Sequence, residues 1–264
     1  MKIAIIGVGN IGTAIANGLI ANGTCETLFL TKRNTGDLAS YQGKKGVIIT
    51  ADNKEAVKLA DLLIFAVQPH QFQNILAELK GYITKEKIVI SAITGYKISQ
   101  MEAIVGADKN IIRVMPNTAI AVGKSMTCIC ANENGNKNMA ATLSIFENLG
   151  ATIVIPEEQM QAATVICASG IAFWMRLIRA TTQGAIQLGF ESKEALHMSI
   201  HTCLGAASLL VDSGSHPEQE IDKVTTPRGC TIEGLNEMEH QGLSSSLIKG
   251  LTVSYEKITQ ISKD

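Results

Sequence analysis

The fold is decided by residues 3–12, which read IAIIGVGNIG and run into a helical pattern from Thr13 to Ile20. A short apolar strand thus leads directly into a G-x-G-x-x-G motif. In such a motif Gly7 permits a tight turn, Gly9 lets a pyrophosphate approach the backbone, and Gly12 lets strand and helix pack closely. The N-terminus of the helix adds N–H groups and a positive dipole. The stretch therefore predicts a dinucleotide-binding turn, against the alternative of a glycine turn without a ligand.

Short and mostly continuously apolar segments recur through the first half of the chain. Such segments are typical of strands that are buried on both faces of a mainly parallel sheet. The predicted strands are Ile3 to Ile6, Thr27 to Leu30, Val47 to Ile49, Leu62 to Val67, Ile88 to Ile93, Ile111 to Met115, Met126 to Cys130 and Thr152 to Ile155.

Helix starts lie between these segments. Asp52 stands before one helical segment, Pro69 opens another, and Ser99 precedes Glu102 in the pattern of a capping box. Strand and helix therefore alternate along the chain. This alternation predicts an α/β fold, with a Rossmann-like, doubly wound and mainly parallel sheet in a dinucleotide-binding domain over residues 1–156.

The sequence changes character after Pro156. Gln159 to Phe190 carries only two charges, both arginines, and Leu196 to Val211 carries none. Apolar residues at helical spacing cover nearly all sides of these segments, so the helices must bury more than one face. The pattern predicts an all-helical domain over residues 157–264. It forms either its own multi-helix core or, in the interpretation we prefer, a core shared with a second subunit.

The composition limits the classes of function. The chain has 264 residues, of which 18% are charged, against roughly 25% in an average soluble domain. Its 23 Lys and Arg against 24 Asp and Glu give a formal net charge of −1. Such a balance provides no field for phosphate backbones or anionic membranes, so we expect no nucleic-acid partner and no membrane partner.

The cysteines and the N-terminus indicate the compartment. Six scattered cysteines form no C-x-x-C pair, which favours free thiols in a reducing compartment over disulfides or a zinc site. Met1 to Gly12 lacks the charged flank and cleavage site of a signal peptide. The longest uncharged helical stretch, Gln159 to Met175, falls short of the ~20 apolar residues that a membrane span needs. His197 and His201 have metal-ligand spacing without a third ligand. We therefore predict a cytoplasmic protein without a metal.

The second predicted strand indicates which nucleotide is bound. An NAD site would place an acid near its end to hold the ribose hydroxyls. Here Leu30 is followed by Thr31-Lys32-Arg33-Asn34, which contains two cations and no acid. An arginine fork suits a ribose 2′-phosphate. The segment predicts NADPH in preference to NADH, with NADH as the second choice, against the alternative of a solvated basic turn.

Three further segments are placed for chemistry. AVQP at 66–69 and RVMPNT at 113–118 follow buried strands, whose carboxyl ends face the ligand crevice in such a sheet. KVTTPRGCT at 223–231 is a turn before the helical Ile232 to Glu239, and it offers hydroxyls and backbone N–H groups to a small anion such as a carboxylate. Taken alone, that turn is better explained as an N-capped helix.

Five motifs occur in the order, and at roughly the spacing, of the pyrroline-5-carboxylate reductase family. They are GVGNIGTA at 7–14, AVQP at 66–69, SAITG at 91–95, RVMPNT at 113–118 and VTTPRGCT at 224–231. The chain resembles that family over essentially its whole length. The resemblance implies reduction of the cyclic imine 1-pyrroline-5-carboxylate to L-proline with NADPH or NADH, the last step of proline synthesis. It also implies a C-terminal helical domain that interlocks into homodimers, often assembled into larger rings.

The resemblance also implies roles for individual residues. The pyrophosphate would be held by Gly7, Gly9, Asn10, Ile11 and Gly12, with Arg33 and Asn53 near the ribose phosphate. The nicotinamide side would be lined by Ala66, Val67, Gln68, Pro69, Ala92, Ile93 and Thr94. The substrate carboxylate would be held by Thr226, Gly229 and Cys230, with the hydroxyl of the catalytic Thr231 near the imine nitrogen.

Departures from the family pattern concern the substrate. This chain has Gln68 where the family has lysine, and Arg228 where it has glycine. It also has Ile171 and Phe173 where the family has proline and tyrosine. Another cyclic imino acid therefore stays open as the substrate.

Two functions compete with imine reduction. A β-hydroxyacid dehydrogenase uses a lysine on its long central helix as acid and base, and this chain has no lysine between Pro156 and Glu191. That absence argues against alcohol oxidation. A non-catalytic NADP-binding sensor protein would keep the glycine turn and would have no need of the turn from Thr226 to Thr231. An assay of NADPH oxidation separates the sensor from the enzyme.

Overall fold

The computed structural model describes residues 1–261. Contacts within the chain divide it into two units. The first unit contains Met1–Ser169 together with the described residues from Tyr255 onward, and the second contains Gly170–Ser254. The predicted boundary between residues 156 and 157 lies earlier along the chain. The first helical residues after Pro156 pack against a strand of the sheet, which places them with the first unit.

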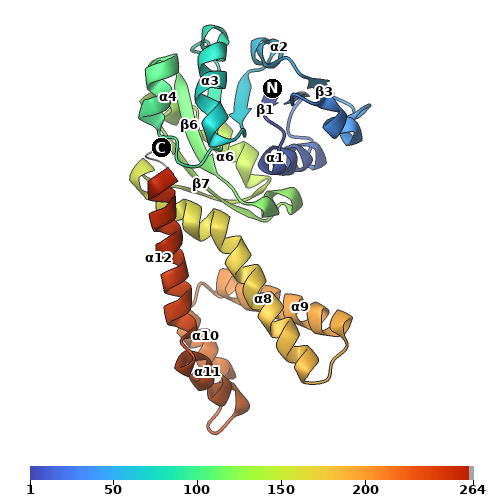
Figure 1. Cartoon of the computed structure of the whole chain (residues 1–264), viewed down its shortest axis with the longest axis vertical. Coiled ribbons are helices and arrows are strands. Elements are labelled where there is room, and N and C mark those ends of the chain that lie inside the picture. Colours follow the sequence, from blue (N-terminus) through green and yellow to red (C-terminus); the bar gives the residue numbers. More distant parts are fainter. Residues whose placement is uncertain (262–264) are drawn as a thin grey trace. The chain divides into compact units, whose positions relative to one another are not determined.

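The first unit is built on one eight-stranded sheet (Figure 1). The strands are β1 (Lys2–Ile6), β2 (Thr27–Thr31), β3 (Val47–Thr50), β4 (Leu62–Phe65), β5 (Ile88–Ser91), β6 (Asn110–Met115), β7 (Ser125–Ala131) and β8 (Gly150–Val154). Their order is β3-β2-β1-β4-β5-β6-β7-β8, and all neighbours are parallel except β6 and β7. All eight predicted strands are present, and the predicted mainly parallel, doubly wound sheet is confirmed. The winding direction reverses between β1 and β4, and ligands bind at such a switch point.

Helices and short 3₁₀ turns connect the strands of this unit. They are α1 (Asn10–Ala21), η1 (Thr35–Tyr41), α2 (Asn53–Leu59), α3 (Pro69–Leu79), η2 (Lys80–Tyr82), α4 (Ile98–Val105), η3 (Thr118–Val122), α5 (Glu133–Asn136) and α6 (Met139–Glu147).

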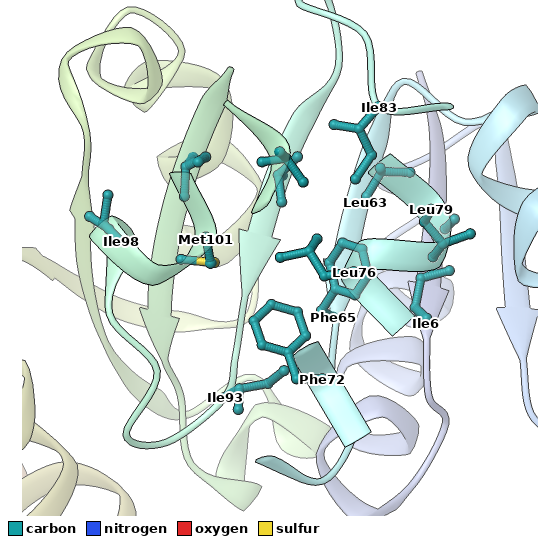
Figure 2. Packing of buried hydrophobic residues seen from close by; sticks show 14 of the residues in the cluster. Ile6, Leu63, Phe65, Phe72, Leu76, Leu79, Ile83, Ile93, Ile98 and Met101 are labelled. Atoms are coloured by element: carbon teal, nitrogen blue, oxygen red, sulfur yellow. The ribbon is translucent and has the colours of Figure 1, made fainter. Parts of the chain in front are cut away.

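Side chains of each strand alternate between two apolar cores, one on each face of the sheet. In β1, Ile3 and Ile5 belong to the core that α1 and α6 share, whereas Ile6 belongs to the core that α2, α3 and α4 share. In the latter core the rings of Phe65 and Phe72 meet edge to face, with centroids 5.4 Å apart (Figure 2). Burying one such side chain contributes about 1.5–3 kcal/mol. The sheet unit therefore has a closed core of its own.

Two predicted helix starts are confirmed. The Asp52 carboxylate accepts hydrogen bonds from the amides of Lys54 and Glu55 at 2.8 and 3.2 Å, so it caps α2 as expected. Pro69 is the first residue of α3, where its fixed φ and missing N–H do no harm.

The capping box predicted at Ser99 is wrong, because α4 begins one residue earlier. The amide of Lys97 donates to Gln100 Oε1 at 2.8 Å, and the amide of Ile98 donates to Glu157 Oε1 at 2.7 Å. These two oxygens satisfy the first amides of the helix, so Ser99 lies inside its first turn.

The rest of the described chain is helical, as predicted. Its elements are η4 (Glu157–Gln159), α7 (Met160–Ala163), the π-helical segment η5 (Thr164–Ser169), α8 (Gly170–Gln187), α9 (Ser192–Ser213), α10 (Pro217–Val224), α11 (Cys230–His240) and α12 (Leu243–Ile261). The predicted helix from Gln159 to Phe190 thus contains a π-helical segment and ends at Gln187. Gly189 follows with a φ of +103°, which ends the helix.

The unit Gly170–Ser254 lacks the closed core of the sheet unit. Its large apolar side chains stay exposed in the single chain: Trp174 of α8 is 59% exposed and Leu204 of α9 is 58% exposed. Exposed apolar area on this scale marks a surface that another molecule covers. The buried residues of this unit are all small: Gly170, Thr182, Ala195 and Ser199.

One helical run, Glu157–Gln187, is long and apolar enough to cross a membrane by length and composition alone. It has 31 residues, because the helix continues beyond the uncharged stretch that ends at Met175. A lone helix of this kind is weak evidence for a span, since helices that pack in protein cores and interfaces meet the same criterion.

Candidate functional site

A cavity of about 990 Å³ opens at the carboxyl ends of β1, β2 and β4. This is the switch point of the sheet, and the volume lies at the upper end of the ~300–1,000 Å³ typical of ligand pockets. The lining residues are Ile6, Gly7, Val8, Gly9, Thr31, Lys32, Arg33, Asn34, Asp37, Asn53, Ala66, Val67, Gln68, His70, Gln71, Asn74, Ile75 and Glu78.

The glycine turn is shaped as a phosphate cradle. Gly7 has a φ of +94°, and a Cβ at this residue would collide with Cγ1 of Val67. A Cβ on Gly12 would collide with the carbonyl oxygen of Gly7, so α1 and β1 need this glycine to pack closely. A Cβ on Gly9 would meet nothing within 4 Å. No side chain caps α1, so its first amides are left for a ligand. The residues present therefore fit a pyrophosphate.

Thr31, at the end of β2, holds this turn from the side. Its carbonyl oxygen accepts hydrogen bonds from the amides of Gly7 and Val8 at 3.2 and 3.1 Å. Its buried hydroxyl oxygen accepts a further bond from Gly7 at 3.3 Å. Two strands thus preorganise one loop, which lowers the cost of ordering it around a ligand. Thr31 carries no signal of this role in the sequence, because a hydroxyl that bonds backbone groups leaves no spacing pattern.

The cavity brings together several of the residues predicted to bind the cofactor: Gly7, Gly9, Arg33, Asn53, Ala66, Val67 and Gln68. Asn10, Ile11 and Gly12 belong to the first turn of α1, and Pro69 to the first turn of α3, without lining the cavity. The part that these four play in cofactor binding stays a prediction.

The predicted nicotinamide segment after β5 does not line the cavity. The amide of Ala92 donates to the carbonyl oxygen of Phe65 at 2.9 Å, and Ile93 is buried in the core that α3 and α4 share. Ile93 packs inward because it continues the apolar alternation of β5, so only its backbone can face a ligand. The roles of Ala92 and Thr94 stay predictions.

The corner of the cavity that is predicted to hold the ribose phosphate, called the ribose corner below, contains two cations and one acid. Lys32 and Arg33 follow β2 as expected. Asp37 of η1 also lines the corner, although the sequence predicted no acid there. Lys32 Nζ pairs with Asp37 at 2.9 Å. Arg33 is exposed and has no ion-pair partner within residues 1–261. The acid is therefore neutralised, and Arg33 leaves one positive charge for a phosphate.

Helix α3 supplies a polar wall that the motifs did not predict. Gln71, Asn74 and Glu78 lie three or four residues apart, His70 stands next to Gln71, and all four line the cavity. Glu78 pairs with Lys54 at 2.9 Å, and the hydrogen bond of this pair raises the pKa of Lys54. The second acid of the cavity is thus also paired. The sequence signal that could have predicted this wall is the polar stripe on α3 opposite the buried face of the helix.

The helical unit holds the predicted substrate turn, between α10 and α11. The amide of Gly229 donates to the carbonyl oxygen of Thr226 at 2.9 Å, which closes the turn. Gly229 is the N-cap of α11 and brings no side chain to cap it. Cys230 and Thr231 are the first residues of the helix, where amides lack partners within the helix and suit a small anion. The four predicted substrate residues thus meet at one helix N-terminus. Their roles stay predictions.

Arg228 is the one non-glycine with a positive φ in the described part of the chain, at 59°. An L-residue in this left-handed region costs about 1–2 kcal/mol relative to the right-handed one. The family pattern has glycine at this position, which adopts such a φ freely. The departure at Arg228 therefore keeps the geometry of the turn and adds an exposed cation beside it.

No group of three or more His, Cys, Asp or Glu that could hold a metal occurs in residues 1–261. His197 and His201 contact each other on α9, with ring centroids 4.4 Å apart. The six cysteines are free thiols.

Two family comparisons cover most of the chain. Residues 157–261 match the family described as pyrroline-5-carboxylate reductase dimerisation. Residues 2–95 match the family described as NADP oxidoreductase, coenzyme F420-dependent. The first match contains the exposed apolar helices and indicates a homodimer. The second match contains the glycine turn and Arg33, so this half is an NADP-binding domain.

Individual relatives agree with these matches. Pyrroline-5-carboxylate reductase 2 of Dictyostelium discoideum is 40% identical over 97% of this chain and 91% of its own length. Pyrroline-5-carboxylate reductase 1 of the same organism is 40% identical over 98% of this chain, and this chain spans about half (49%) of its length. A crystal structure of Plasmodium falciparum pyrroline carboxylate reductase with NADP bound is 25% identical. Its TM-score is 0.89, over 99% of this chain and 98% of that one.

Proposed function

The chain belongs to the pyrroline-5-carboxylate reductase family, and we propose that it draws the hydride for its reaction from NADPH in preference to NADH. The reaction is the reduction of the cyclic imine 1-pyrroline-5-carboxylate to L-proline, the last step of proline synthesis. The observation that carries the cofactor preference is the ribose corner, where Asp37 is paired with Lys32 and Arg33 has no ion-pair partner in the part of the chain that the structure describes. The NADP bound to the Plasmodium relative supports the same preference.

The preference is tested by steady-state kinetics with both cofactors. Arg33→Ala removes a charge-assisted contact worth about 1.5–3 kcal/mol, so we expect the KM for NADPH to rise roughly 10- to 100-fold. The KM for NADH should change little, because NADH has no 2′-phosphate. Lys45→Ala is the matched control, since Lys45 is an exposed cation outside the cavity. A wild-type preference for NADH, or an equal rise for both cofactors, contradicts the proposal.

The chain's own residues supply binding and orientation. When bound, NADPH supplies the hydride. Thr226 and the amides of Gly229 and Cys230 hold the substrate carboxylate at the N-terminus of α11, where the helix dipole favours an anion. The Thr231 hydroxyl oxygen accepts a hydrogen bond from the N–H of the protonated imine. The ring imine is basic enough to arrive protonated, so positioning suffices and no strong acid is required.

The role of Thr231 is tested by separating turnover from binding. Thr231→Ala should lower kcat about 10- to 100-fold, from the loss of one hydrogen bond to a charged group, and leave the KM for NADPH unchanged. Thr231→Ser keeps the hydroxyl and should retain most of the rate. An unchanged kcat in the alanine variant removes Thr231 from the mechanism.

Another cyclic imino acid is the second candidate substrate. The observation that favours it is the exposed Arg228 in the substrate turn, where the family pattern has glycine. NADPH oxidation measured against cyclic imino acids of different ring size and carboxylate position decides between them. The highest kcat/KM should belong to 1-pyrroline-5-carboxylate. Binding of NADPH without turnover of any imine would instead indicate a sensor protein.

We also propose an assembly and a location. The homodimer forms through the helices of Gly170–Ser254, and dimers associate further into a ring. Light scattering should then give a mass that is a multiple of the dimer, and a monomer at micromolar concentration contradicts both steps. The six free thiols support a cytoplasmic location, because thiols persist in a reducing compartment. Cell fractionation tests it.

A further inference from the structure

Two cysteines far apart in the sequence meet inside the sheet unit. Cys128 lies on β7 and Cys167 lies in the π-helical segment η5, and their Sγ atoms are 3.6 Å apart. The two residues are 39 positions apart in the chain. Both elements belong to Met1–Ser169, so the packing of one unit sets the distance. Neither cysteine lines the nucleotide cavity or the substrate turn.

The backbone holds both residues in place. Cys128 lies within β7, paired with Met115 of β6 on one side and Ile153 of β8 on the other. The carbonyl oxygen of Cys167 accepts a hydrogen bond from Asn117 Nδ2 at 3.0 Å. A disulfide has its sulfur atoms ~2.05 Å apart, so the two must approach by about 1.5 Å more. Rotation of the two side chains and the loosely wound π-turn provide that movement.

The two thiols differ in access and in acidity. Cys128 is only 3% exposed, whereas Cys167 is partly exposed. The two sulfur atoms share an S–H···S hydrogen bond, and this bond together with burial raises the pKa of Cys128. The same bond stabilises the thiolate of Cys167 and lowers its pKa to about 7. Cys167 is therefore the nucleophile within reach of solvent, and Cys128 is the buried resolving thiol.

We propose that Cys128 and Cys167 are a redox pair that hydrogen peroxide converts into an intramolecular disulfide. The Cys167 thiolate attacks one peroxide oxygen, the O–O bond breaks, and the leaving hydroxide takes up the proton lost by Cys167. Cys167 is then a sulfenic acid. The sulfur of Cys128 attacks the sulfur of Cys167, the S–O bond breaks, and hydroxide leaves with the Cys128 proton as water. Two thiols lose two electrons in total, and one peroxide is reduced to two waters.

The disulfide ties η5 to β7 immediately before Gly170, where the helical unit begins. A π-helical segment of this kind is rare and frequently marks a functional site. The cross-link closes a chain loop and restricts the freedom of η5 relative to the sheet. The proposal depends neither on the cofactor preference nor on the identity of the substrate.

Peptide mapping of the full-length protein tests the proposal. After brief treatment with hydrogen peroxide, non-reducing mass spectrometry should show one cross-linked peptide pair that contains Cys128 and Cys167. Four of the six thiols should remain open to alkylation in the unfolded protein, and dithiothreitol should restore all six. Six remaining thiols, a different cysteine pair, or a sulfinic acid at Cys167 without the cross-link would overturn the proposal.

Variants separate the two roles. Cys128→Ala removes both the resolving thiol and the hydrogen bond to Cys167. Cys167 should therefore react with peroxide more slowly and then stop at the sulfenic acid, which dimedone traps over a longer exposure; the wild type should give little adduct. Cys130→Ala is the matched control, because Cys130 is equally buried on the same strand and in the same core. It should still form the cross-link. Cys167→Ala, at a partly exposed position, should give neither cross-link nor adduct, and it keeps the test decisive if Cys128→Ala does not fold. A dimedone adduct as strong in the wild type as in Cys128→Ala contradicts the resolving role.

Discussion

The sheet unit buries its large apolar side chains, whereas the helical unit leaves many of them exposed. In the sheet unit Phe65 and Phe72 are fully buried between strands and helices of the same chain. In the helical unit Trp174 and Leu204 are more than half exposed, and the buried residues are small. Both regions are rich in apolar residues, yet only one closes on itself. A low charge content therefore indicates a complete core in one region and a subunit interface in the other.

A core deletion in the sheet unit has the largest expected effect. Phe72→Ala removes a ring that contacts Phe65 and Tyr96, and the cavity it leaves should cost about 3–5 kcal/mol of unfolding free energy. Urea unfolding at constant protein concentration measures it. Gln73→Ala, at the exposed neighbour, should stay within about 0.5 kcal/mol of wild type. A cost near that of the control would mean that this core is not closed.

A charge on the helical surface should break the dimer and spare the sheet unit. Leu204→Glu places a carboxylate on the exposed apolar face of α9 through which we propose that the dimer forms, at an expected cost of about 2–4 kcal/mol in association. The dimer dissociation constant should then rise roughly 30- to 1,000-fold. Sedimentation over a concentration series measures it. Lys193→Glu, at an exposed polar position of the same helix, should stay dimeric. A dimer unchanged by Leu204→Glu contradicts an interface on α9.

Two glycines of the phosphate-binding turn should differ in what their substitution impairs: Gly9 ligand binding, and Gly12 folding. Gly9→Ala adds a Cβ that meets no protein atom, so the free energy of unfolding should change by less than about 1 kcal/mol. The same Cβ would occupy the space predicted for the pyrophosphate, so the Kd for NADPH should rise at least about tenfold, or ~1.4 kcal/mol. Fluorescence titration measures the Kd. Gly12→Ala should instead lose stability, because its Cβ collides with Gly7. An equal loss of stability in both variants would contradict the prediction that Gly9 serves ligand binding and Gly12 serves packing.

The substrate turn carries the smallest expected effect. Arg228→Gly relieves a left-handed φ worth about 1–2 kcal/mol, and the greater freedom of unfolded glycine offsets part of the gain. The net stabilisation should be about 0.5 kcal/mol, measured as a small rise in Tm at fixed protein concentration. Arg228→Ala keeps the strained φ and serves as the control. If alanine stabilises as much as glycine, the arginine side chain rather than the backbone causes the effect.

The sequence predicted those parts of the fold and site that depend on neighbours along the chain. Buried strands, the cap at Asp52, and the turns at Gly7–Gly12 and Thr226–Thr231 all leave local patterns of apolar, capping or glycine residues. The prediction at Ser99 was wrong because a distant carboxylate, that of Glu157, caps α4 from outside its own segment. A local pattern cannot include an acceptor that arrives from 59 residues away.

The missed parts of the site have the same cause. Asp37 reaches the ribose corner through the turn after β2, and Glu78 lies in the cavity because α3 presents its polar face there. These acids pair with Lys32 and Lys54, and Arg33 is left without an ion-pair partner among the described residues. This arrangement depends on how three segments fold together. Spacing along the chain contains no information about such pairs.

By itself, the sequence determined the alternation of strands and helices, the phosphate-binding turn and the excess of apolar surface in the second half, because each depends on residues within one or two turns of each other. Only the tertiary structure decided that Arg33 has no ion-pair partner among residues 1–261, that Arg228 adopts a left-handed φ, and that the Sγ atoms of Cys128 and Cys167 lie 3.6 Å apart. The cysteine contact joins residues 39 positions apart and follows from the packing of the whole unit. The Lys32–Asp37 pair and the φ of Arg228 depend on the path of the backbone through a turn, which the residue types alone do not specify.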